Sequence, residues 1–556
     1  PAIPGMPLKT FAFNDSGIAF CAGRFGDKSR LFCAYLGVDL LGKIASAATV
    51  GEEERDATWF PVECKSKDNT ESFPVEHVRH MSFNATGTAL AVCMEDTFLT
   101  LVVDNQLHKW LLVQDVAAEP TPITFLASMP VRRRLHRLLH AEWHPLHSDV
   151  FAVLWKNGAY PCRSLFVLYS VGAEGDDLWE DRQSTTILDS DDELTSFTFV
   201  QHSNGLDNWE LFTVYFLLKE GSVRPVCPCI PRGTQIERGT WLGLMSQAKE
   251  DEDGRAQGWL ESAWETRGAG EGSGDIMEYL GSDLKPATGR PALQVREESS
   301  QAHVEEDAIS CKAINMCQED TVWDVPTVFV MSYLSGNVDV LVSLNPVPGP
   351  VFDLERTPGR AQSGLHRLQR LKCGSEEDGY DPHLYLEHDV GATDQLFLVG
   401  SRAAYTLVLP WLHHLREYFH DGQTQDAPPP DFQQWREQIV ISCVVHEETE
   451  LLGFQSSVYL SKRRTLARTR SALRSFMVST AKKRVSAVNV DEDSSEDFLD
   501  AKYRFDKTIL ETGRSCKHIS PTPWKVPQNM ESETSRKAVL EAVTKMTMRV
   551  GELLTF

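Results

Sequence analysis

The stretch "FAFNDSGIAFCAGRFGDKSRLFCAYL" at residues 11–36 decides the fold, because its pattern returns further along the chain. At residues 81–104 the sequence reads "MSFNATGTALAVCMEDTFLTLVVD". Each stretch contains Phe-Asn-x-x-Gly, then an apolar run of strand length, a polar gap and a second apolar run. Short runs of strand-forming residues that are bounded by turn residues predict β-strands. The two stretches therefore predict a repeated β-unit.

A third unit begins at residue 140 with "HAEWHPLHSDVFAVLW", which places Trp143 in the aromatic position and Pro145 just after it. A second apolar run, "SLFVLYSV", follows at residues 164–171. A polar gap separates the two runs, and both are rich in residues that favour strands. This unit therefore predicts a turn that leads into a pair of strands.

Histidines recur through the third unit at intervals of three and four residues, at His136, His140, His144 and His147. On a helix this spacing would place four imidazoles on one face, as a metal site requires. Proline inside a helix costs about 3 kcal/mol, and it disfavours helical geometry in the residue before it. Because Pro145 follows His144 directly, we interpret the four histidines as structural and expect no metal site here.

Four further units follow, at residues 194–230, 327–344, 395–410 and 438–461. Repeated short strands with turn residues between them are typical of a β-propeller, and the absence of the WD dipeptide from the expected places makes this one degenerate. A blade cannot bury both of its faces alone, so the ring has to close. We predict an all-β fold: a degenerate seven-bladed β-propeller with inter-blade helical insertions, followed by the start of an α-helical coiled coil. Two stacked β-sandwiches are the alternative that the same strands allow.

The predicted propeller spans residues 1–465 and contains one long interruption. Residues 246–308 are rich in Gly, Asp and Glu, a composition that predicts a mobile insertion between blades. Within it, Trp259, Leu260 and Trp264 are candidates for a short docking helix.

A basic and then acidic linker is expected after the propeller, at residues 466–530. The basic run at residues 462–484 indicates a solvated face or a contact with an acidic neighbour, and nuclear targeting is the alternative.

The last residues, 531–556, change to a helical period. Apolar side chains there are spaced four, three, four and three residues apart, as in the seam of a coiled coil. Ser532, Glu533 and Ser535 supply residues that favour a helix start. We expect this segment to be the first part of a longer helical tail that pairs with partner helices, with packing on the propeller as the alternative. The predicted seam consists of Val539, Val543, Met546, Val550 and Leu553.

The composition excludes several classes of protein. The 556 residues carry a net charge of −24, which argues against a general nucleic-acid surface because such a surface needs clustered Lys and Arg. No apolar run approaches the length of a membrane span, and the first residues lack the layout of a signal peptide. The 12 cysteines are scattered, which fits reduced, buried thiols, and the close pairs Cys227/Cys229 and Cys311/Cys317 lack zinc-ribbon spacing.

Motifs of catalysis are not found in the sequence. Residues 37–44, "GVDLLGKI", nearly match a phosphate-binding loop, but Ile44 occupies the place of the Ser or Thr that binds magnesium. Neither Gly-x-Ser-x-Gly nor His-Glu-x-x-His occurs. We therefore expect no enzyme activity, no cofactor and no metal.

Several stretches resemble one known family. "ELFTVYFLLKEGSVRPVCPCIPRG" at residues 210–233 looks like a blade of the propeller nucleoporin of the cytoplasmic-face pore subcomplex, the eighty-two- or eighty-eight-kilodalton nucleoporin family. The Trp-x-Pro unit at residue 143 resembles another of its blades, and "LHHLREYF" at residues 412–419 resembles its inter-blade helix. The resemblance covers most of residues 75–465, whereas the insertion and the basic run have no counterpart.

The resemblance implies a non-enzymatic scaffold at the cytoplasmic face of the nuclear pore complex. Members of the family use the propeller to dock the C-terminal tail of a phenylalanine-glycine-repeat nucleoporin and the autoproteolytic domain of another. Their coiled coil then joins a hetero-oligomer, and the assembly supports mRNA export. The resemblance implies no direct contact with nucleic acid and no membrane insertion.

One predicted helix has an apolar face of its own. Its side chains share one side at helical spacing, so the stripe is a candidate site for a partner's amphipathic helix. The alternative is that the stripe packs on its own propeller. The stripe consists of Trp411, Leu412, Leu415, Tyr418 and Phe419.

Two other functions stay open from the sequence. A substrate receptor of a ubiquitin ligase or a signalling complex predicts a monomeric propeller whose C-terminal helix packs within the chain. An enzyme with its site in the central channel predicts His and carboxylate groups that converge there with shifted pKa values.

Overall fold

The computed structural model describes thirty-one strands and the short helices between them. The described residues are 9–14, 17–25, 28–35, 60–65, 72–73, 75, 77–95, 97–103, 123–128, 136–157, 163–171, 184–201, 209–248, 254–267, 276–281, 286, 292–296, 306–315, 327–343, 349–350, 352, 364–373, 383–388, 394–409, 411–412, 440–446, 451–459, 462–469 and 473–477. The chain separates into two compact units, Pro1–Asn489 and Val490–Phe556, and all described residues lie in the first.

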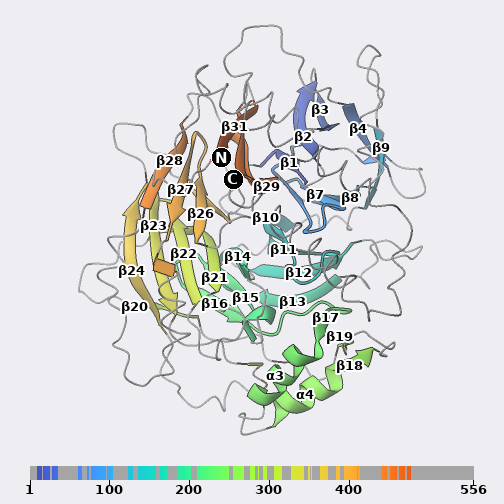
Figure 1. Ribbon diagram of the computed structural model, residues 1–556, viewed down its shortest axis with the longest axis vertical. Helices are drawn as coiled ribbons and strands as arrows, with labels where there is room; N and C mark the ends of the chain where they lie inside the picture. The colour runs from blue at the N-terminus through green and yellow to red at the C-terminus, as the bar shows by residue number, and fades with distance from the viewer. Residues whose placement is uncertain are drawn as a thin grey trace, which may run out of the picture. The chain divides into compact units, whose positions relative to one another are not determined.

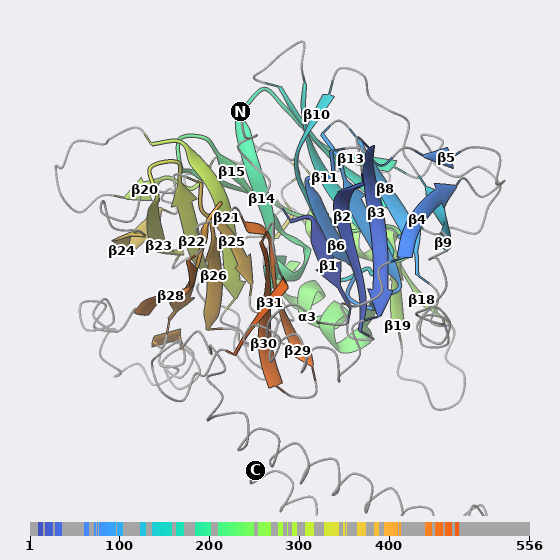
Figure 2. The ribbon, with the colours of Figure 1, turned by 90° about the horizontal axis from the view of Figure 1, so that it is seen from above.

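The described strands form seven blades that follow one another in chain order (Figures 1 and 2). Blade 1 contains β1 (Phe11–Phe13), β2 (Ile18–Phe25), β3 (Lys28–Tyr35) and β4 (Phe60–Lys65), and β5 (Ser72–Phe73) pairs with β4. Blade 2 contains β6 (His80–Phe83), β7 (Ala89–Cys93), β8 (Phe98–Val102) and β9 (Ile123–Ser128). Blade 3 contains β10 (His136–Trp143), β11 (Val150–Asn157), β12 (Ser164–Ser170) and β13 (Ser184–Ser190).

The second half of the ring has the same plan. Blade 4 contains β14 (Leu194–Gln201), β15 (Val214–Leu218) and β16 (Val223–Val226); blade 5 contains β21 (Ala308–Asn315), β22 (Thr327–Tyr333), β23 (Asn337–Ser343) and β24 (Leu365–Lys372); blade 6 contains β25 (Tyr385–His388), β26 (Gln395–Val399), β27 (Ala403–Val408) and β28 (Val440–His446); blade 7 contains β29 (Leu451–Tyr459), β30 (Lys462–Thr469) and β31 (Leu473–Met477).

The first strands of the blades line the centre of the ring. Strands β1, β6, β10, β14, β21 and β25 each contact the next in that order, and β29 lies beside β1. The predicted all-β, seven-bladed propeller is therefore confirmed.

The inner strands of blades 2 to 5 are buried on both faces by the neighbouring blades. On β11, Phe151 and Trp155 join the cluster shared with blade 2, whereas Ala152 and Leu154 join the cluster shared with blade 4. Successive side chains of a strand point to opposite faces, so the six buried positions of β11 are apolar on both sides. This explains why the strands read as short continuous apolar runs.

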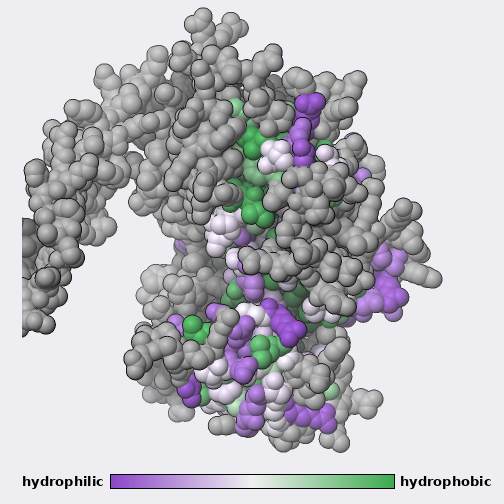
Figure 3. Space-filling view, turned by 90° about the vertical axis from the view of Figure 1, so that its right-hand side faces the viewer, coloured by the Kyte–Doolittle hydropathy of each residue, from purple (hydrophilic) through white to green (hydrophobic). Residues whose placement is uncertain are grey.

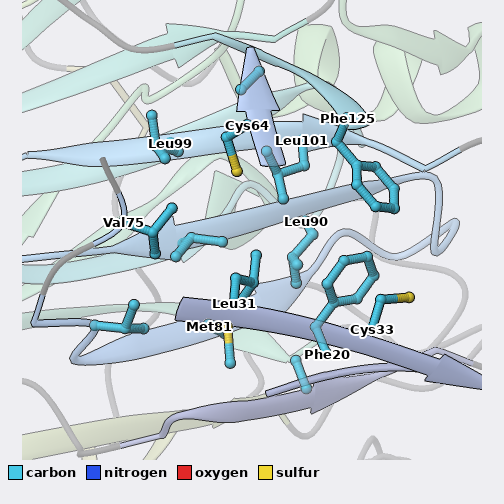
Figure 4. Packing of buried hydrophobic residues seen from close by; sticks show 14 of the residues in the cluster. Phe20, Leu31, Cys33, Cys64, Val75, Met81, Leu90, Leu99, Leu101 and Phe125 are labelled. Carbon is cyan, nitrogen blue, oxygen red and sulfur yellow. The ribbon is translucent and has the colours of Figure 1, made fainter. Parts of the chain in front are cut away.

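The cluster between blades 1 and 2 shows how two blades pack (Figure 4). Phe20 of β2 meets Phe125 of β9 edge to face, with ring centroids 5.3 Å apart. Leu31, Leu90 and other apolar side chains from both blades complete the cluster. Aromatic pairs of this geometry contribute about 0.5–1.5 kcal/mol beyond the area that they bury.

Some blades are also joined by strand pairing. The outermost strands β4 and β9 pair in parallel, so blades 1 and 2 form one sheet. The innermost strands β14 and β21 pair in parallel between blades 4 and 5. At the outer edge of the same two blades, Leu293 bonds to Val223 of β16, and β20 (Val295–Arg296) pairs with β24.

The repeated asparagine of the opening motif has a structural reason. Asn14 accepts the N–H of Ile18 in its own turn at 3.0 Å and donates to the carbonyl of Gly87 in blade 2 at 2.9 Å. Asn84 accepts the N–H of Ala89 at 3.0 Å and donates to the carbonyl of Ser148 in blade 3 at 3.0 Å. Each side chain therefore closes one turn and fixes the next blade.

A histidine takes this role in the third unit. The Nδ1 atom of His144 accepts the N–H of Leu146 at 3.2 Å, so Nε2 carries the proton and donates to the carbonyl of Cys229 of blade 4, also at 3.2 Å. The turn that Pro145 predicts is present between β10 and β11.

The last predicted unit is divided between two blades. β28 pairs with β27 and completes blade 6, whereas β29 begins blade 7. β30 and β31 then extend blade 7 to Met477, so the basic run at residues 462–484 contains two strands and the propeller continues past residue 465. The helical segment at Trp411 lies between β27 and β28, inside a blade and not between blades.

We predict that Asn84→Ala lowers the free energy of unfolding by about 2–3 kcal/mol, because it leaves buried N–H groups and a carbonyl of blade 3 without a partner. Chemical denaturation of the full chain measures this change. Ala85→Ser, at an exposed position of the same turn, is the control and should change stability by less than about 0.5 kcal/mol. Equal stability of the two variants would contradict the role of Asn84.

Candidate partner-binding surfaces and the central channel

The apolar stripe that the sequence assigns to a partner starts inside the propeller core. Trp411 and Leu412 are 0% exposed and pack in the cluster between blades 5 and 6, with Leu384 and Leu396. These two residues therefore pack on their own propeller, which is the alternative that the sequence left open, and not on a partner. Leu415, Tyr418 and Phe419 lie outside the described residues, and so do all five residues of the predicted coiled-coil seam.

The insertion after blade 4 is folded over its described residues. It contains β17 (Gln235–Glu237), α3 (Arg238–Ala248), α4 (Arg255–Ala263), β18 (Trp264–Arg267) and β19 (Ile276–Tyr279), and its three strands form a small sheet. Trp259 of α4 stacks near Trp209, with ring centroids 6.3 Å apart, and Trp264 lies 6.0 Å from Phe212. Trp209 and Phe212 both belong to the 3₁₀ helix η2 (Trp209–Phe212), which precedes β15.

This packing corrects two predictions about residues 246–308. The described part is ordered around its own apolar cluster, so the interpretation of a mobile insertion is wrong there. Trp259, Leu260 and Trp264 are buried, and Trp264 begins a strand, so they do not form an exposed docking helix. The reason is that the aromatic residues of the insertion complete a core with η2, which precedes them by about fifty residues in the sequence.

The insertion nevertheless exposes apolar area. Among the described residues, four large hydrophobic side chains are exposed, and three of them are on the insertion: Leu242 (52%), Leu280 (40%) and Ile276 (36%). In Figure 3, hydrophobic and hydrophilic residues alternate over the lower part of the face, where the insertion lies. Exposed apolar side chains of this kind make the insertion a candidate contact surface.

The central channel contains charged side chains that pair with one another. Lys9, just before β1, donates to both carboxylate oxygens of Glu387 on β25 at 3.1 and 3.3 Å. Lys312 of β21 donates to Glu142 of β10 at 2.8 Å. Both pairs join blades that are not neighbours, because one blade lies between each pair.

Histidines lie between these ion pairs. Burial, followed by the charges of Lys9 and other nearby cations, lowers the pKa of His80 on β6 well below its ordinary value. Burial and then Lys312 lower the pKa of His388 on β25 to about 3. Burial opposes ionisation of Glu142, but Lys312 and His140 outweigh it and hold the pKa of this carboxyl far below its usual range. His80 and His388 are therefore neutral and the Glu142 carboxylate is charged at neutral pH.

These groups meet one condition of a catalytic channel and fail another. His80, His388 and Glu142 do converge there with shifted pKa values, as the enzyme hypothesis predicts. The two lysines are each paired, and their side chains are only 12% and 9% exposed for Lys9 and Lys312. The charged groups neutralise one another and leave little surface for a substrate.

Other reactive groups of the described chain are buried. The eight cysteines whose side chains the structure describes are buried and free, and burial raises the pKa of Cys64 and Cys311 to about 12, so these thiols are poor nucleophiles. No group of three or more His, Cys, Asp or Glu residues among the described positions has the arrangement of a metal site. No helix of the described part has the length and apolar character needed to cross a bilayer.

A buried carboxylate of blade 5 has a structural role. Asp339 accepts from Arg370 Nε at 2.8 Å and from Arg367 Nε at 3.1 Å. The guanidinium of Arg370 also lies 5.2 Å from the ring centre of Tyr333. Because each of these contacts is made within blade 5, the cluster stabilises the blade.

The sequence interpretation missed the channel residues. Their only signal is a charged residue or histidine in or next to the first strand of a unit, as in "KTFAF", "RHMSF", "HAEW", "SCKAIN" and "YLEH". Singly, each is an ordinary polar residue at a strand end. The pattern becomes informative only once these strands are known to line one channel.

The fold matches known structures, although no protein-family model and no curated protein sequence matches the chain. The Chaetomium thermophilum heterotrimeric complex of the Nup82 N-terminal domain, the Nup159 tail and the Nup145N autoproteolytic domain matches with a TM-score of 0.60 and 12% identity, over 85% of this chain and 95% of the other. The yeast heterotrimeric Nup82–Nup159–Nup116 nucleoporin complex matches with a TM-score of 0.53 and 8% identity, over 85% and 99%. The chain thus has the β-propeller fold of the Nup82 N-terminal domain, and the resemblance seen in the sequence is confirmed at the level of the fold.

We predict that the chain loses stability between pH 7 and pH 5. The unfolded state takes up protons below the ordinary histidine pKa of about 6.5, whereas buried His80 stays neutral in the folded state, so stability falls as the pH falls. Each such histidine removes about 1.4 kcal/mol per pH unit at most. Denaturation curves at several pH values measure the slope. His80→Gln should reduce the slope, and an unchanged slope would contradict the buried, neutral state.

Trp411→Ala should lower the free energy of unfolding by about 3–5 kcal/mol, because it leaves a large cavity in the core between blades 5 and 6. Leu242→Ala, at an exposed apolar position, is the matched control and should cost less than about 0.5 kcal/mol. Thermal and chemical denaturation compare the two variants. A cost below 1 kcal/mol for Trp411→Ala would show that its side chain is not part of the core.

Proposed function

We propose that this protein is a non-enzymatic scaffold of the nuclear pore complex, placed at its cytoplasmic face, where it docks other nucleoporins and supports mRNA export and nucleocytoplasmic transport. One observation carries the proposal: the chain matches the propeller of two nucleoporin complexes over 85% of its own length and at least 95% of theirs. The buried, mutually paired charges of the channel support a role without catalysis.

The proposed partners are of two classes. Both matched complexes are heterotrimers that contain Nup159 together with Nup145N or Nup116. We assign to this chain the corresponding classes, the C-terminal tail of a phenylalanine-glycine-repeat nucleoporin and the autoproteolytic domain of another. The propeller and its insertions supply the docking surfaces, and no direct contact with nucleic acid is part of the proposal.

The apolar stripe after β27 is the proposed contact for one partner helix. Because Trp411 and Leu412 are buried, they anchor the start of the segment to the propeller and are removed from the partner contact. The proposed contact is thereby reduced to Leu415, Tyr418 and Phe419, which follow on the same side at helical spacing.

The C-terminal heptads are the proposed site of hetero-oligomer formation. An apolar seam at spacings of four and three residues pairs with the same seam on another helix. Residues 531–556 supply about two heptads, and coiled-coil partners would complete the assembly.

The proposal predicts that the tagged chain, purified from cells, brings down other nucleoporins, which mass spectrometry identifies. Phe419→Ala should reduce recovery of the repeat nucleoporin tail at least about tenfold while leaving the melting temperature unchanged, since an apolar anchor of a docked helix contributes 1–2 kcal/mol or more. Deletion of residues 531–556 should reduce recovery of the coiled-coil partners.

Glu417→Ala is the matched control, because Glu417 lies on the opposite side of the same predicted helix. It should bind as the unchanged chain does. Recovery of ubiquitin-ligase subunits, or of no stable partner, would overturn the scaffold proposal and return the propeller to the substrate-receptor alternative.

A further inference from the structure

No described strand pairing joins blade 7 to the rest of the ring. Its three described strands form a sheet of their own, and none of them pairs with a described strand of blade 6 or blade 1. β29 lies beside β1, and Phe454 of β29 packs on Phe397 of blade 6 with ring centroids 5.0 Å apart. By contrast, strand pairing joins blade 1 to blade 2 and blade 4 to blade 5.

The ion pair between Lys9 and Glu387 spans this connection. Lys9 is fixed to blade 2 by backbone bonds, since its N–H donates to Arg79 and its carbonyl accepts from Met81, both at 2.8 Å. Glu387 lies opposite Phe397 in the register of β25 and β26. The pair therefore joins the first two blades to blade 6 across the channel, past blade 7.

We infer that this cross-channel ion pair (Lys9 with Glu387) closes the ring between blades 1 and 6, so that closure does not depend on blade 7 alone. The two side chains are 12% and 17% exposed, and the lysine reaches both carboxylate oxygens. A pair so enclosed is costly to break, because the partner that remains is a buried charge without compensation.

A second pair supports the same arrangement on the other side of the channel. Lys312 of blade 5 reaches Glu142 of blade 3 past blade 4. There, however, β14 and β21 also pair directly, so the ion pair adds to a connection that strands already make. At blade 7 the ion pair has no such strand support among the described residues.

The test is a double-mutant cycle in the full chain, with Lys9→Met, Glu387→Met and both together, measured by chemical denaturation. Each single variant should lower the folding equilibrium constant on the order of 100-fold or more, because it leaves one buried charge. The double variant should recover most of that loss, since two apolar side chains of similar length replace the pair.

A surface pair of equal length is the matched control. Lys156 and Glu193 also lie 3.1 Å apart, but their side chains are 29% and 40% exposed. Lys156→Met and Glu193→Met should each change the equilibrium constant less than about fivefold.

Hydrogen exchange separates ring closure from general stabilisation. In the Glu387→Met variant, exchange should rise first in β1 and in β29, while β10–β12 of blade 3 stay protected. A cycle with no coupling between Lys9 and Glu387, or an exchange increase that is equal in all seven blades, would overturn the inference. Coupling together with localised exchange would establish it.

Discussion

The structure depends on one constraint: the inner strands of blades 2 to 5 are buried on both faces, and the neighbouring blades cover them. β22 shows this as clearly as β11 does, because Val328 and Val330 pack toward blade 6 while Phe329 and Met331 pack toward blade 4. Neither β11 nor β22 has a solvent-exposed face, so their blades are not stable alone. These blades therefore need the closed ring in order to stay folded.

Polar groups make this closure specific where apolar packing cannot. Apolar clusters tolerate small shifts, whereas a hydrogen bond needs its partner within a few tenths of an ångström. Asn14 and Asn84 each bond the turn of the following blade, and His144 bonds Cys229, which follows β16 of blade 4, so all three fix the angle between neighbouring blades. The channel ion pairs act between blades that do not touch. Together, these hydrogen bonds and ion pairs fix the positions of the blades relative to one another.

The repeat was predictable because it is encoded locally. An asparagine that closes its own turn, a glycine with positive φ at the turn end (Gly87, +69°) and an apolar run all fall within about twenty residues. The channel pairs could not be predicted in this way, because their members are far apart in the sequence. Glu142 and Lys312 are separated by 170 residues, and Lys9 and Glu387 by 378. The insertion was misjudged for the same reason: its acidic, glycine-rich composition is local, but the aromatic residues that order it belong partly to η2.

The two helical segments occupy equivalent places in their blades, and this position has a physical reason. The insertion with α3 and α4 follows β16, the third strand of blade 4, and the segment at Trp411 follows β27, the third strand of blade 6. The connection from the third strand to the outer edge lies farthest from the channel and tolerates added chain. The lysines that the structure describes in the channel are paired with carboxylates of other blades, whereas both helical segments follow third strands. Chain added after a third strand can therefore vary without disturbing the strands that meet at the channel.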